Sequence, residues 1–297
     1  MKTSRRRFLT LTAFGLAATT SPEHAFPQRV PKSPQPARLR LSCQEGVAPG
    51  RSLNEKLDFL EAHGFEGIEP WGGGLPGRVE EFQKALQGRK IRVSAVCAGF
   101  EGVLISENEE VRQKAIRSIR EILTAAGALG AVGMIVVPAF NGQTKLGHVE
   151  ARELLVRLLP ELGEHAHKVG TRILLEPLNR REAWFLRQLA DAAAICRDVN
   201  HPGVAMMGDF WHMTWEEPSD FAAFVAAGPY LRHVHIASRK ERKMPGEDPG
   251  DDYTDGMRGL KLIGYQDFIS FECGSKGDPR RSIPEAVRLL REQWEAA

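Results

Sequence analysis

The sequence is poor in cysteine and carries almost no net charge. Its four cysteines form no Cys-x-x-Cys pair and are too few for a disulfide framework, so neither a zinc module nor a disulfide-stapled domain is indicated. The 40 basic residues nearly balance the 38 acidic ones, so no chain-wide field would gather nucleic acid or a membrane surface. The expected partner is therefore a small molecule, and the fold must be stabilised by its apolar core.

Long apolar runs are missing as well. The N-terminal apolar run, residues 11–18, is too short to span a membrane. It follows Ser4-Arg5-Arg6-Arg7-Phe8-Leu9, a pattern typical of a twin-arginine export signal, with a basic disordered tail as the alternative. We predict a signal peptide at 1–25, a proline-rich linker at 26–37 and one domain at 38–297. The precursor would engage the twin-arginine export machinery, and the mature protein would be periplasmic or otherwise exported, without membrane contact.

Short apolar segments alternate with helical patterns eight times from residue 38 onward. The expected strands are 38–43, 65–70, 91–97, 133–138, 173–175, 204–209, 231–235 and 268–272. Single helices between strands indicate parallel βαβ units, and eight such units predict one closed (β/α)8 barrel, a TIM barrel. An open doubly wound sheet is the alternative, but the turn Cys43-Gln44-Glu45-Gly46 lacks the GxGxxG dinucleotide-binding pattern.

Several helix boundaries can be predicted from residues that commonly begin or end helices. Ser52 is expected to cap the first helix and Gly64 to end it. Ser106 is the expected cap of a long third helix, and Phe185 the expected first residue of the helix after the fifth strand. The final helix is expected to begin at Ser282.

Strands five to eight each end in a side chain that can bind a metal ion. These side chains are Glu176, Asp209, His235 and Glu272. Pro177 ends the fifth strand directly after Glu176, and a buried carboxylate is costly unless it is paired or bound to a cation. Three carboxylates and one imidazole suit a single divalent ion, Mn²⁺ first, with Mg²⁺ and Co²⁺ as alternatives.

Glu176 and Glu272 are also the candidate catalytic pair. Strands five and eight of a closed barrel lie three apart, so their tips are expected to face each other across the mouth and to flank a substrate. Such a pair can remove a proton from one face of a carbon and return one on the other. The alternative is that the two carboxylates cap nearby helices. His233 shares a strand face with His235, and a hydrogen-bonded core position is the favoured interpretation for it.

Aromatic residues at the same barrel face are candidates for an apolar wall. Glu69 and Trp71 end the second strand there. The apolar face of a ligand ring packs well on an indole, so Trp71, Trp211 or Phe100 could line the site. Simple packing at the rim is an equal alternative for each of them.

The strand-end motifs resemble those of the xylose isomerase-like barrel superfamily. Within it, the pattern is most similar to ketose 3-epimerases of the tagatose and psicose type, with hydroxypyruvate isomerase a near relative. The motifs are Glu176-Pro177-Leu178-Asn179-Arg180 with Glu182, Asp209-x-x-His212-Met213, His233-Val234-His235, Arg242-Lys243-Met244-Pro245-Gly246 and Phe271-Glu272.

The resemblance implies roles for individual residues. It implies metal ligands at Glu176, Asp209, His235 and Glu272, with the two glutamates doubling as the acid/base pair. It also implies substrate contacts from Glu182, His212 and Arg242. One extra residue separates His235 from the Arg-x-x-Pro-Gly segment, so Arg239 is the alternative to Arg242, and the basic cluster 239–243 could instead be a solvated loop paired with the acidic segment 247–252.

The expected activity is that of a divalent-metal-dependent isomerase or epimerase, acting on a keto-sugar through a cis-enediolate. The main alternative is a lyase or dehydratase that uses the same metal site on a keto-glycoside or keto-polyol. A phosphodiesterase on the same barrel would need more histidine ligands and a basic face for DNA. A non-enzymatic sugar-binding module would have no use for four ligands around an ion. An oligomer is compatible with the sequence.

Overall fold

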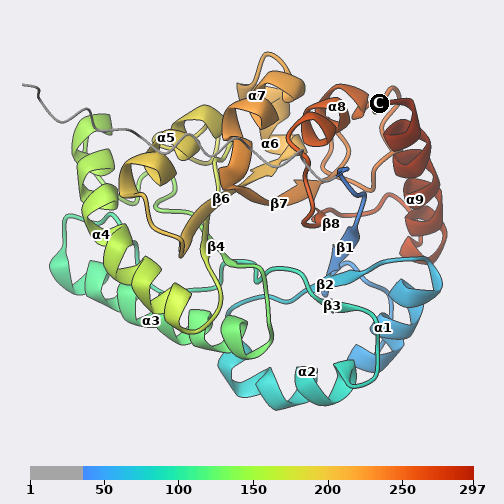
Figure 1. The fold of residues 1–297 in the computed structure, drawn as a ribbon, viewed down its shortest axis with the longest axis horizontal. Helices are drawn as coiled ribbons and strands as arrows, with labels where there is room; N and C mark the ends of the chain where they lie inside the picture. Colours follow the sequence, from blue (N-terminus) through green and yellow to red (C-terminus); the bar gives the residue numbers. More distant parts are fainter. Residues whose placement is uncertain (1–35) are drawn as a thin grey trace, which may run out of the picture. The chain divides into compact units, whose positions relative to one another are not determined.

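A closed barrel of parallel strands forms the centre of the part of the chain that the structure, a computed structural model, describes: residues 36–297 (Figure 1). Its strands are β1 (Leu41–Gln44), β2 (Gly67–Glu69), β3 (Arg92–Val93), β4 (Met134–Val136), β5 (Ile173–Leu175), β6 (Val204–Asp209), β7 (Leu231–Ile236) and β8 (Ile269–Phe271). The order β3-β2-β1-β8-β7-β6-β5-β4 is closed by a parallel bridge between Val96 and Met134. The predicted (β/α)8 barrel is thereby confirmed, whereas the export signal and nearly all of the linker lie outside the described residues and stay predictions.

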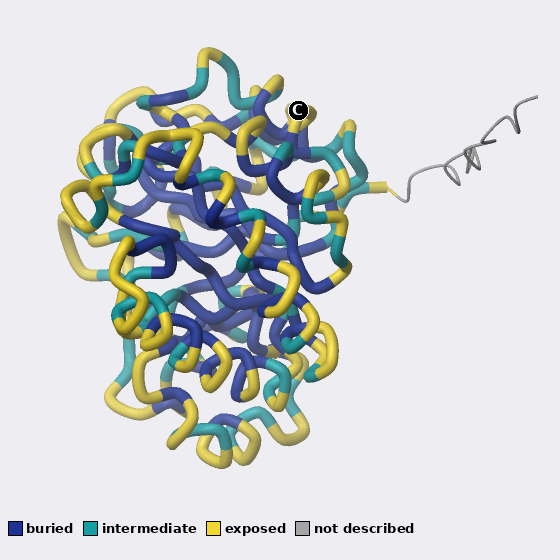
Figure 2. Tube along the Cα trace, turned by 90° about the vertical axis from the view of Figure 1, so that its left-hand side faces the viewer, coloured by how far each residue is buried: buried dark blue, intermediate teal, exposed yellow. Residues whose placement is uncertain are grey.

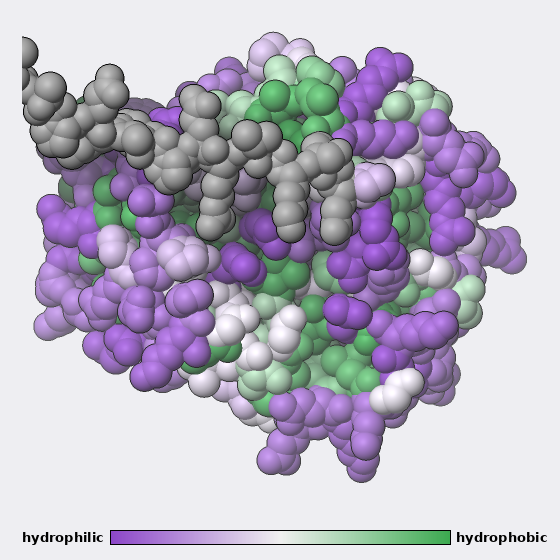
Figure 3. Space-filling model, in the orientation of Figure 1, coloured by the Kyte–Doolittle hydropathy of each residue, from purple (hydrophilic) through white to green (hydrophobic). Residues whose placement is uncertain are grey.

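Helices surround the strands in Figure 1. They are α1 (Leu53–Ala62), η1 (Leu75–Arg78), α2 (Val79–Leu86), α3 (Glu109–Ala128), α4 (His148–Lys168), α5 (Leu189–Val199), α6 (Phe210–Glu216), α7 (Asp220–Ala227), η2 (Gly228–Tyr230), α8 (Thr254–Leu262) and α9 (Pro279–Ala296). On the face in Figure 3, hydrophilic residues predominate around the rim, and apolar atoms gather near the middle. Among residues 36–297, no helix combines the length and hydropathy needed to cross a membrane.

Alternation along the strands separates an inner from an outer core. Leu174 of β5 and Met207 of β6 belong to a small cluster inside the barrel, whereas their neighbours in sequence pack in the larger cluster with the helices. Buried segments accordingly run through the interior in Figure 2, and exposed residues lie on the outer turns. Glu176 and Asp209 come two residues after Leu174 and Met207, so the same alternation directs them to the barrel axis at the C-terminal ends of the strands.

The first helix forms as its boundary residues predict. Ser52 is its N-cap, and the Ser52 side chain accepts a hydrogen bond from the Glu55 amide at 3.2 Å. Gly64 follows the helix with φ +77°, a left-handed conformation that favours glycine. One face of α1 packs Leu57 and Leu60 against the core.

Two predicted caps are wrong, because several cap-forming residues compete at each place. The N-cap of α3 is Asn108, whose side chain accepts from the Glu110 and Val111 amides, and Ser106 lies outside the helix. The N-cap of α9 is Asp278, and Ser282 lies within the helix. Pro279 directly after Asp278 favours this earlier start, since its fixed φ suits the first helical position and it has no amide to leave unpaired.

The chain after β5 and β6 also differs from expectation. The helix after β5 begins at Leu189 rather than Phe185, because the preceding segment folds back and the Leu178 amide bonds the Leu186 carbonyl at 3.1 Å. An additional short helix, α6, begins directly after Asp209. Both departures shape the mouth of the barrel, where the polar residues lie.

Candidate metal centre

The four predicted metal ligands converge at the C-terminal end of the barrel. Glu176, Asp209, His235 and Glu272 each offer a ligand atom, and these atoms all lie within 4.8 Å of one another. They come from β5, β6, β7 and β8, which are neighbours in the sheet. Glu176 and Glu272 both belong to this cluster, so their carboxylates meet at one place in the barrel mouth.

The donor atoms fit a divalent cation. Nδ1 of His235 is buried and has no hydrogen-bond partner of acceptable geometry, although Glu272 Oε2 lies 3.0 Å and Glu176 Oε1 3.8 Å away. A buried imidazole nitrogen surrounded by carboxylate oxygens is suited to share a cation with them. Oxygen donors with one imidazole also match the preference of Mn²⁺, Mg²⁺ or Co²⁺ over metals that favour thiolates.

The two glutamates experience different electrostatic surroundings. Burial raises the pKa of Glu176, and the nearby Glu272 carboxylate adds to this, whereas His235 opposes it. Burial would also raise the pKa of Glu272, but His235 and Arg242 outweigh it and lower that pKa to about 2. Two carboxylates whose pKa values are driven apart are suited to act as acid and base.

A helix N-terminus orients Asp209. Its Oδ1 accepts a hydrogen bond from the Trp211 amide at 2.8 Å and so caps α6. Its Oδ2 is left to face the centre, 3.2 Å from Nη2 of Arg242 and 3.5 Å from Nε2 of His212. The unpredicted helix α6 therefore fixes which oxygen of Asp209 is available to a cation.

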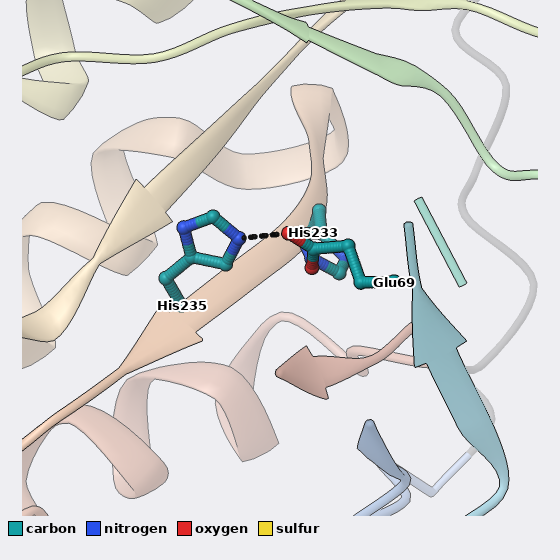
Figure 4. A group of neighbouring side chains, drawn as sticks. All are labelled: Glu69, His233 and His235. Carbon is teal, nitrogen blue, oxygen red and sulfur yellow. Dashed lines mark hydrogen bonds and ion pairs between the residues drawn. The ribbon is translucent and has the colours of Figure 1, made fainter. Parts of the chain in front are cut away.

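A second buried group lies behind His235 and was not predicted. Glu69, at the end of β2, accepts from Nε2 of His233 at 2.7 Å and from Nε2 of His235 at 2.9 Å (Figure 4). Since a carboxylate only accepts, the proton of the His235 Nε2 is fixed there, and Nδ1 remains the nitrogen that faces the other three ligands. The core interpretation of His233 agrees with this contact.

The charges of this buried group reinforce one another. Burial would raise the pKa of Glu69, but the two histidines outweigh it and hold the pKa well below its ordinary value. Burial lowers the pKa of His233, and it would lower that of His235, but Glu69 and Glu272 raise the pKa of His235 well above its ordinary value. The side chains of Glu69 and both histidines are fully buried, so these interactions are little weakened by solvent.

His212 is aimed at the centre by Asn179. The backbone amide of Asn179 donates to Nδ1 of His212 at 3.1 Å, and the Asn179 side-chain amide lies 2.8 Å from the same nitrogen. Because a backbone amide only donates, Nδ1 must accept, and a neutral His212 carries its proton on Nε2. Nε2 lies 3.9 Å from Glu176 Oε1, so His212 presents a buried donor toward the centre.

Arg242 rather than Arg239 reaches the centre. Nη2 of Arg242 contacts Glu272 Oε2 at 2.5 Å and Asp209 Oδ2 at 3.2 Å, and its guanidinium stacks 4.5 Å from the centroid of the Trp211 ring. Arg239 points elsewhere: it pairs with Asp220 and donates to the Phe210 carbonyl. The alternative assignment to Arg239 is thus not supported by the geometry.

Two aspartates hold the loop that carries Arg242. Oδ2 of Asp248 accepts from the Ser238 hydroxyl at 2.6 Å and from two backbone amides of the loop, and Asp251 accepts from two more. Burial would raise the pKa of Asp248, but these bonds, first that of Ser238, hold the pKa well below its ordinary value. The acidic segment thus organises the loop backbone more than it pairs with the basic cluster.

The remaining candidates lie at varying distances from the centre. Glu182 is half-buried, and its carboxylate accepts from the Asn179 side chain at 3.1 Å. Trp71 is exposed at the rim, and Phe100 lines a pocket beside it. Cys97 was not predicted, yet its buried Sγ lies 4.0 Å from Glu272 Oε1. Burial, aided by the Glu69 and Glu272 carboxylates, raises the pKa of Cys97 well above its ordinary value, so it remains a thiol.

Comparison with known proteins agrees with the resemblance drawn from the motifs. The family model described as "Xylose isomerase-like TIM barrel" matches residues 57–293. The chain is 30% identical over 263 residues to the 3-dehydro-D-guloside 4-epimerase of Escherichia coli strain K12, covering 85% of this chain and 99% of that protein. It is 35% identical over 111 residues to the D-psicose 3-epimerase of Agrobacterium fabrum strain C58, covering 37% of this chain and 38% of that one.

A solved structure extends the likeness to three dimensions. The crystal structure of 3-keto-D-glucoside 4-epimerase from E. coli superposes with a TM-score of 0.79 at 27% identity, covering 86% of this chain and all of that one. These relatives are sugar epimerases, and the expected enzyme class, an isomerase, is confirmed.

Proposed function

Because this chain belongs to the xylose isomerase-like TIM barrel family, we propose that it is a divalent-metal-dependent epimerase that inverts a sugar carbon next to a ketone. The observation that carries the proposal is the convergence of four ligand atoms within 4.8 Å at the barrel mouth. The relatives support the substrate class. A 3-dehydro sugar inverted at carbon 4 and a ketose inverted at carbon 3 both react at the carbon beside the ketone.

Glu176, Asp209, His235 and Glu272 would hold the ion. When bound, a divalent cation supplies a Lewis acid that polarises the ketone oxygen and stabilises the negative charge that develops on it. Mn²⁺ is the proposed ion, with Mg²⁺ or Co²⁺ as alternatives, because the donors are three carboxylates and one imidazole.

The two glutamates divide the proton transfer. One takes the proton from the carbon beside the ketone, and the electron pair left behind delocalises into the carbonyl. The other gives a proton to the opposite face of that carbon, which inverts it. His212 Nε2 and the Arg242 guanidinium are placed to donate to oxygens on which charge develops. Glu182, held by Asn179, is the proposed acceptor for a substrate hydroxyl.

Lyase or dehydratase chemistry on the same centre is the second candidate. It would begin with the same proton removal but would then expel a leaving group. The relatives named above are epimerases, which favours return of the proton over expulsion. We also propose export through the twin-arginine pathway to the periplasm, on the sequence Ser4 to Leu9 alone.

A panel of substrates in deuterium oxide tests the proposal. Free ketoses and methyl 3-keto-glycosides are incubated with Mn²⁺-loaded protein and followed by proton NMR. We expect one diastereomer to convert to another with deuterium entering at the inverted carbon, and no activity after chelation until the ion is restored. Loss of the aglycone or of water would instead support the lyase or dehydratase. Absence of both exchange and conversion across the panel would contradict any enolising activity.

A further inference from the structure

Two exposed aromatic side chains border an apolar pocket at the barrel mouth. Trp71 is 58% exposed and Phe140 43%, which makes them the most exposed aromatic residues among residues 36–297. The pocket between them has a volume of about 230 Å³, and its wall includes Phe100, Val103 and Val137. These residues follow the ends of β2, β3 and β4, whereas the candidate metal ligands lie at the ends of β5 to β8.

The pocket adjoins the candidate metal centre. Ala98, one of its lining residues, directly follows Cys97, whose Sγ lies 4.0 Å from Glu272 Oε1. On the other side, lining residue Val137 follows Val136, whose carbonyl accepts from the Glu176 amide at 3.2 Å. A ligand that extends from the centre toward β2–β4 would therefore enter the pocket.

The lining offers little to a sugar hydroxyl. None of the ten lining residues is charged, and Gln143 is the one among them with a polar side-chain acceptor. The Gln143 oxygen is already used by the Phe140 amide at 2.9 Å. The polar donors of the lining side chains are the Gln143 amide and the Trp71 indole, so a hydroxyl placed here would replace few of its hydrogen bonds to water, whereas an apolar ring would bury its surface between two aromatic side chains.

The wall of the pocket is already in place. Gly99 has φ +84°, and a Cβ on it would lie 2.1 Å from the backbone nitrogen of Gly73, so the loops after β2 and β3 pack backbone to backbone. On the opposite side, the Asn141 amide bonds the Glu182 carbonyl at 2.8 Å, which ties the segment carrying Phe140 to the chain after β5. Binding here would cost little reorganisation.

We infer that the pocket binds the apolar, aromatic aglycone of a keto-glycoside whose sugar ring occupies the metal centre. The inference rests on the proposed epimerase function and narrows its substrate class from sugars in general to glycosides with such an aglycone. The size is suitable, because a cavity of about 150 Å³ lined by apolar side chains is known to hold benzene.

The decisive comparison uses two substrates that differ only in the aglycone. Methyl and phenyl glycosides of the same 3-keto-hexose are epimerised by the metal-loaded wild-type protein, and kcat and KM are measured for both. We expect kcat/KM to favour the phenyl glycoside by roughly 10- to 100-fold, chiefly through KM, because the aglycone is bound equally before and during the reaction. Equal values for the two glycosides would overturn the inference.

Two variants test whether the preference for the phenyl glycoside arises in this pocket. In Phe140→Ala, the ratio of phenyl to methyl kcat/KM should fall to within about threefold of one. The matched control is Leu262→Ala, which removes a side chain that is 59% exposed on α8, away from the pocket, and should keep the wild-type ratio. A wild-type ratio in Phe140→Ala would place the aglycone elsewhere.

Direct binding separates this inference from the proposed function. Calorimetric titration of the metal-loaded Glu176→Gln variant with each glycoside measures affinity with little catalysis, and turnover is measured on the wild-type protein. Tighter phenyl than methyl binding without turnover of either would support the aglycone pocket and count against the epimerase. Turnover of both with equal KM and equal affinity would support the epimerase and reject the pocket.

Discussion

Glu69→Gln tests whether the buried group behind His235 serves the metal centre. The Glu69 carboxylate is 1% exposed and accepts three hydrogen bonds from side chains. Its Oε1 accepts from His235 and from Gln44, and its Oε2 accepts from His233. Glutamine has nearly the same shape but only one acceptor oxygen and no charge. The substitution therefore perturbs charge and hydrogen bonding without leaving a cavity.

The size of the effect follows from these contacts. Placing the amide oxygen at the Oε1 position keeps two of the bonds, but the amide NH₂ then faces the donor of His233. One buried donor is left unpaired and the His235 bond loses its charge, which together cost about 2–4 kcal/mol of unfolding free energy. This corresponds to a fall in Tm of roughly 5–15 °C. Without the anion behind it, His235 is a weaker ligand, and metal affinity should fall by about 10- to 100-fold.

Two measurements follow the two effects separately. Thermal unfolding by circular dichroism in the presence of chelator gives the stability of the metal-free protein, and calorimetric titration with Mn²⁺ gives the affinity. The control is Glu66→Gln, just before the same strand, whose carboxylate is 40% exposed and pairs with Arg40. An exposed pair contributes about 1 kcal/mol or less, so this control should keep both Tm and affinity close to wild type.

The outcomes distinguish the possible roles of Glu69. A lower Tm with wild-type affinity would leave Glu69 as a stabilising core residue that does not act on the metal. Wild-type values of both would refute the reasoning, since a buried carboxylate with two histidine donors could then be neutralised at no cost.

Three further predictions concern other parts of the site. Asp248→Asn should lower the unfolding free energy by about 2–4 kcal/mol at neutral pH. Because the folded pKa of Asp248 is depressed, this difference from wild type should be constant above about pH 5 and should shrink as the pH falls below the unfolded pKa near 4. Denaturation measured over a range of pH tests both expectations. Arg239→Ala should cost about 1–3 kcal/mol, because it leaves the half-buried Asp220 unpaired, yet Mn²⁺ affinity should not change. Glu176→Gln and Glu272→Gln should each lower kcat by about 10²- to 10⁴-fold while retaining metal, and full turnover in both would contradict the two-carboxylate mechanism.

The convergence of the four candidate metal ligands could be predicted because each member is identified by its own place in the chain. Glu176 and Glu272 directly follow apolar strands, and period-two alternation directs residues two positions beyond Leu174 and Met207 to the barrel axis. Parallel strands bring their ends to one face, so four polar strand ends imply one site without any knowledge of side-chain contacts.

The partners of these residues could not be predicted in the same way. Glu69 and His233 are 164 positions apart and meet only because the barrel closes with both side chains on its axis. Asn179 orients His212 through its ring nitrogen Nδ1, whose position depends on α6. This helix has only seven residues, too few for a pattern in the sequence that would predict it. Such contacts depend on tertiary geometry rather than on local pattern, so the sequence indicates the ligands but not the residues that hold them.

The choice between Arg239 and Arg242 shows why loop residues are harder still. Both arginines lie in the same basic cluster, and their spacing from His235 does not distinguish them. In the structure, the backbone conformation distinguishes them. Arg242 adopts φ +53°, a conformation uncommon outside glycine, and Asp248 accepts from the amides of the two residues before Arg242. The direction of Arg242 thus depends on a carboxylate that sequence spacing alone would assign to surface pairing.

The two halves of the barrel mouth are joined through β2. This strand ends in Glu69, which bonds both histidines of β7, and Trp71 follows two residues later at the edge of the apolar pocket. The apolar wall and the residue that fixes the His235 tautomer therefore lie two residues apart on one strand end. Glu69 is buried and bonded whereas Trp71 is exposed, so a substitution of Trp71 should leave the bonds of Glu69 and the four candidate metal ligands in place.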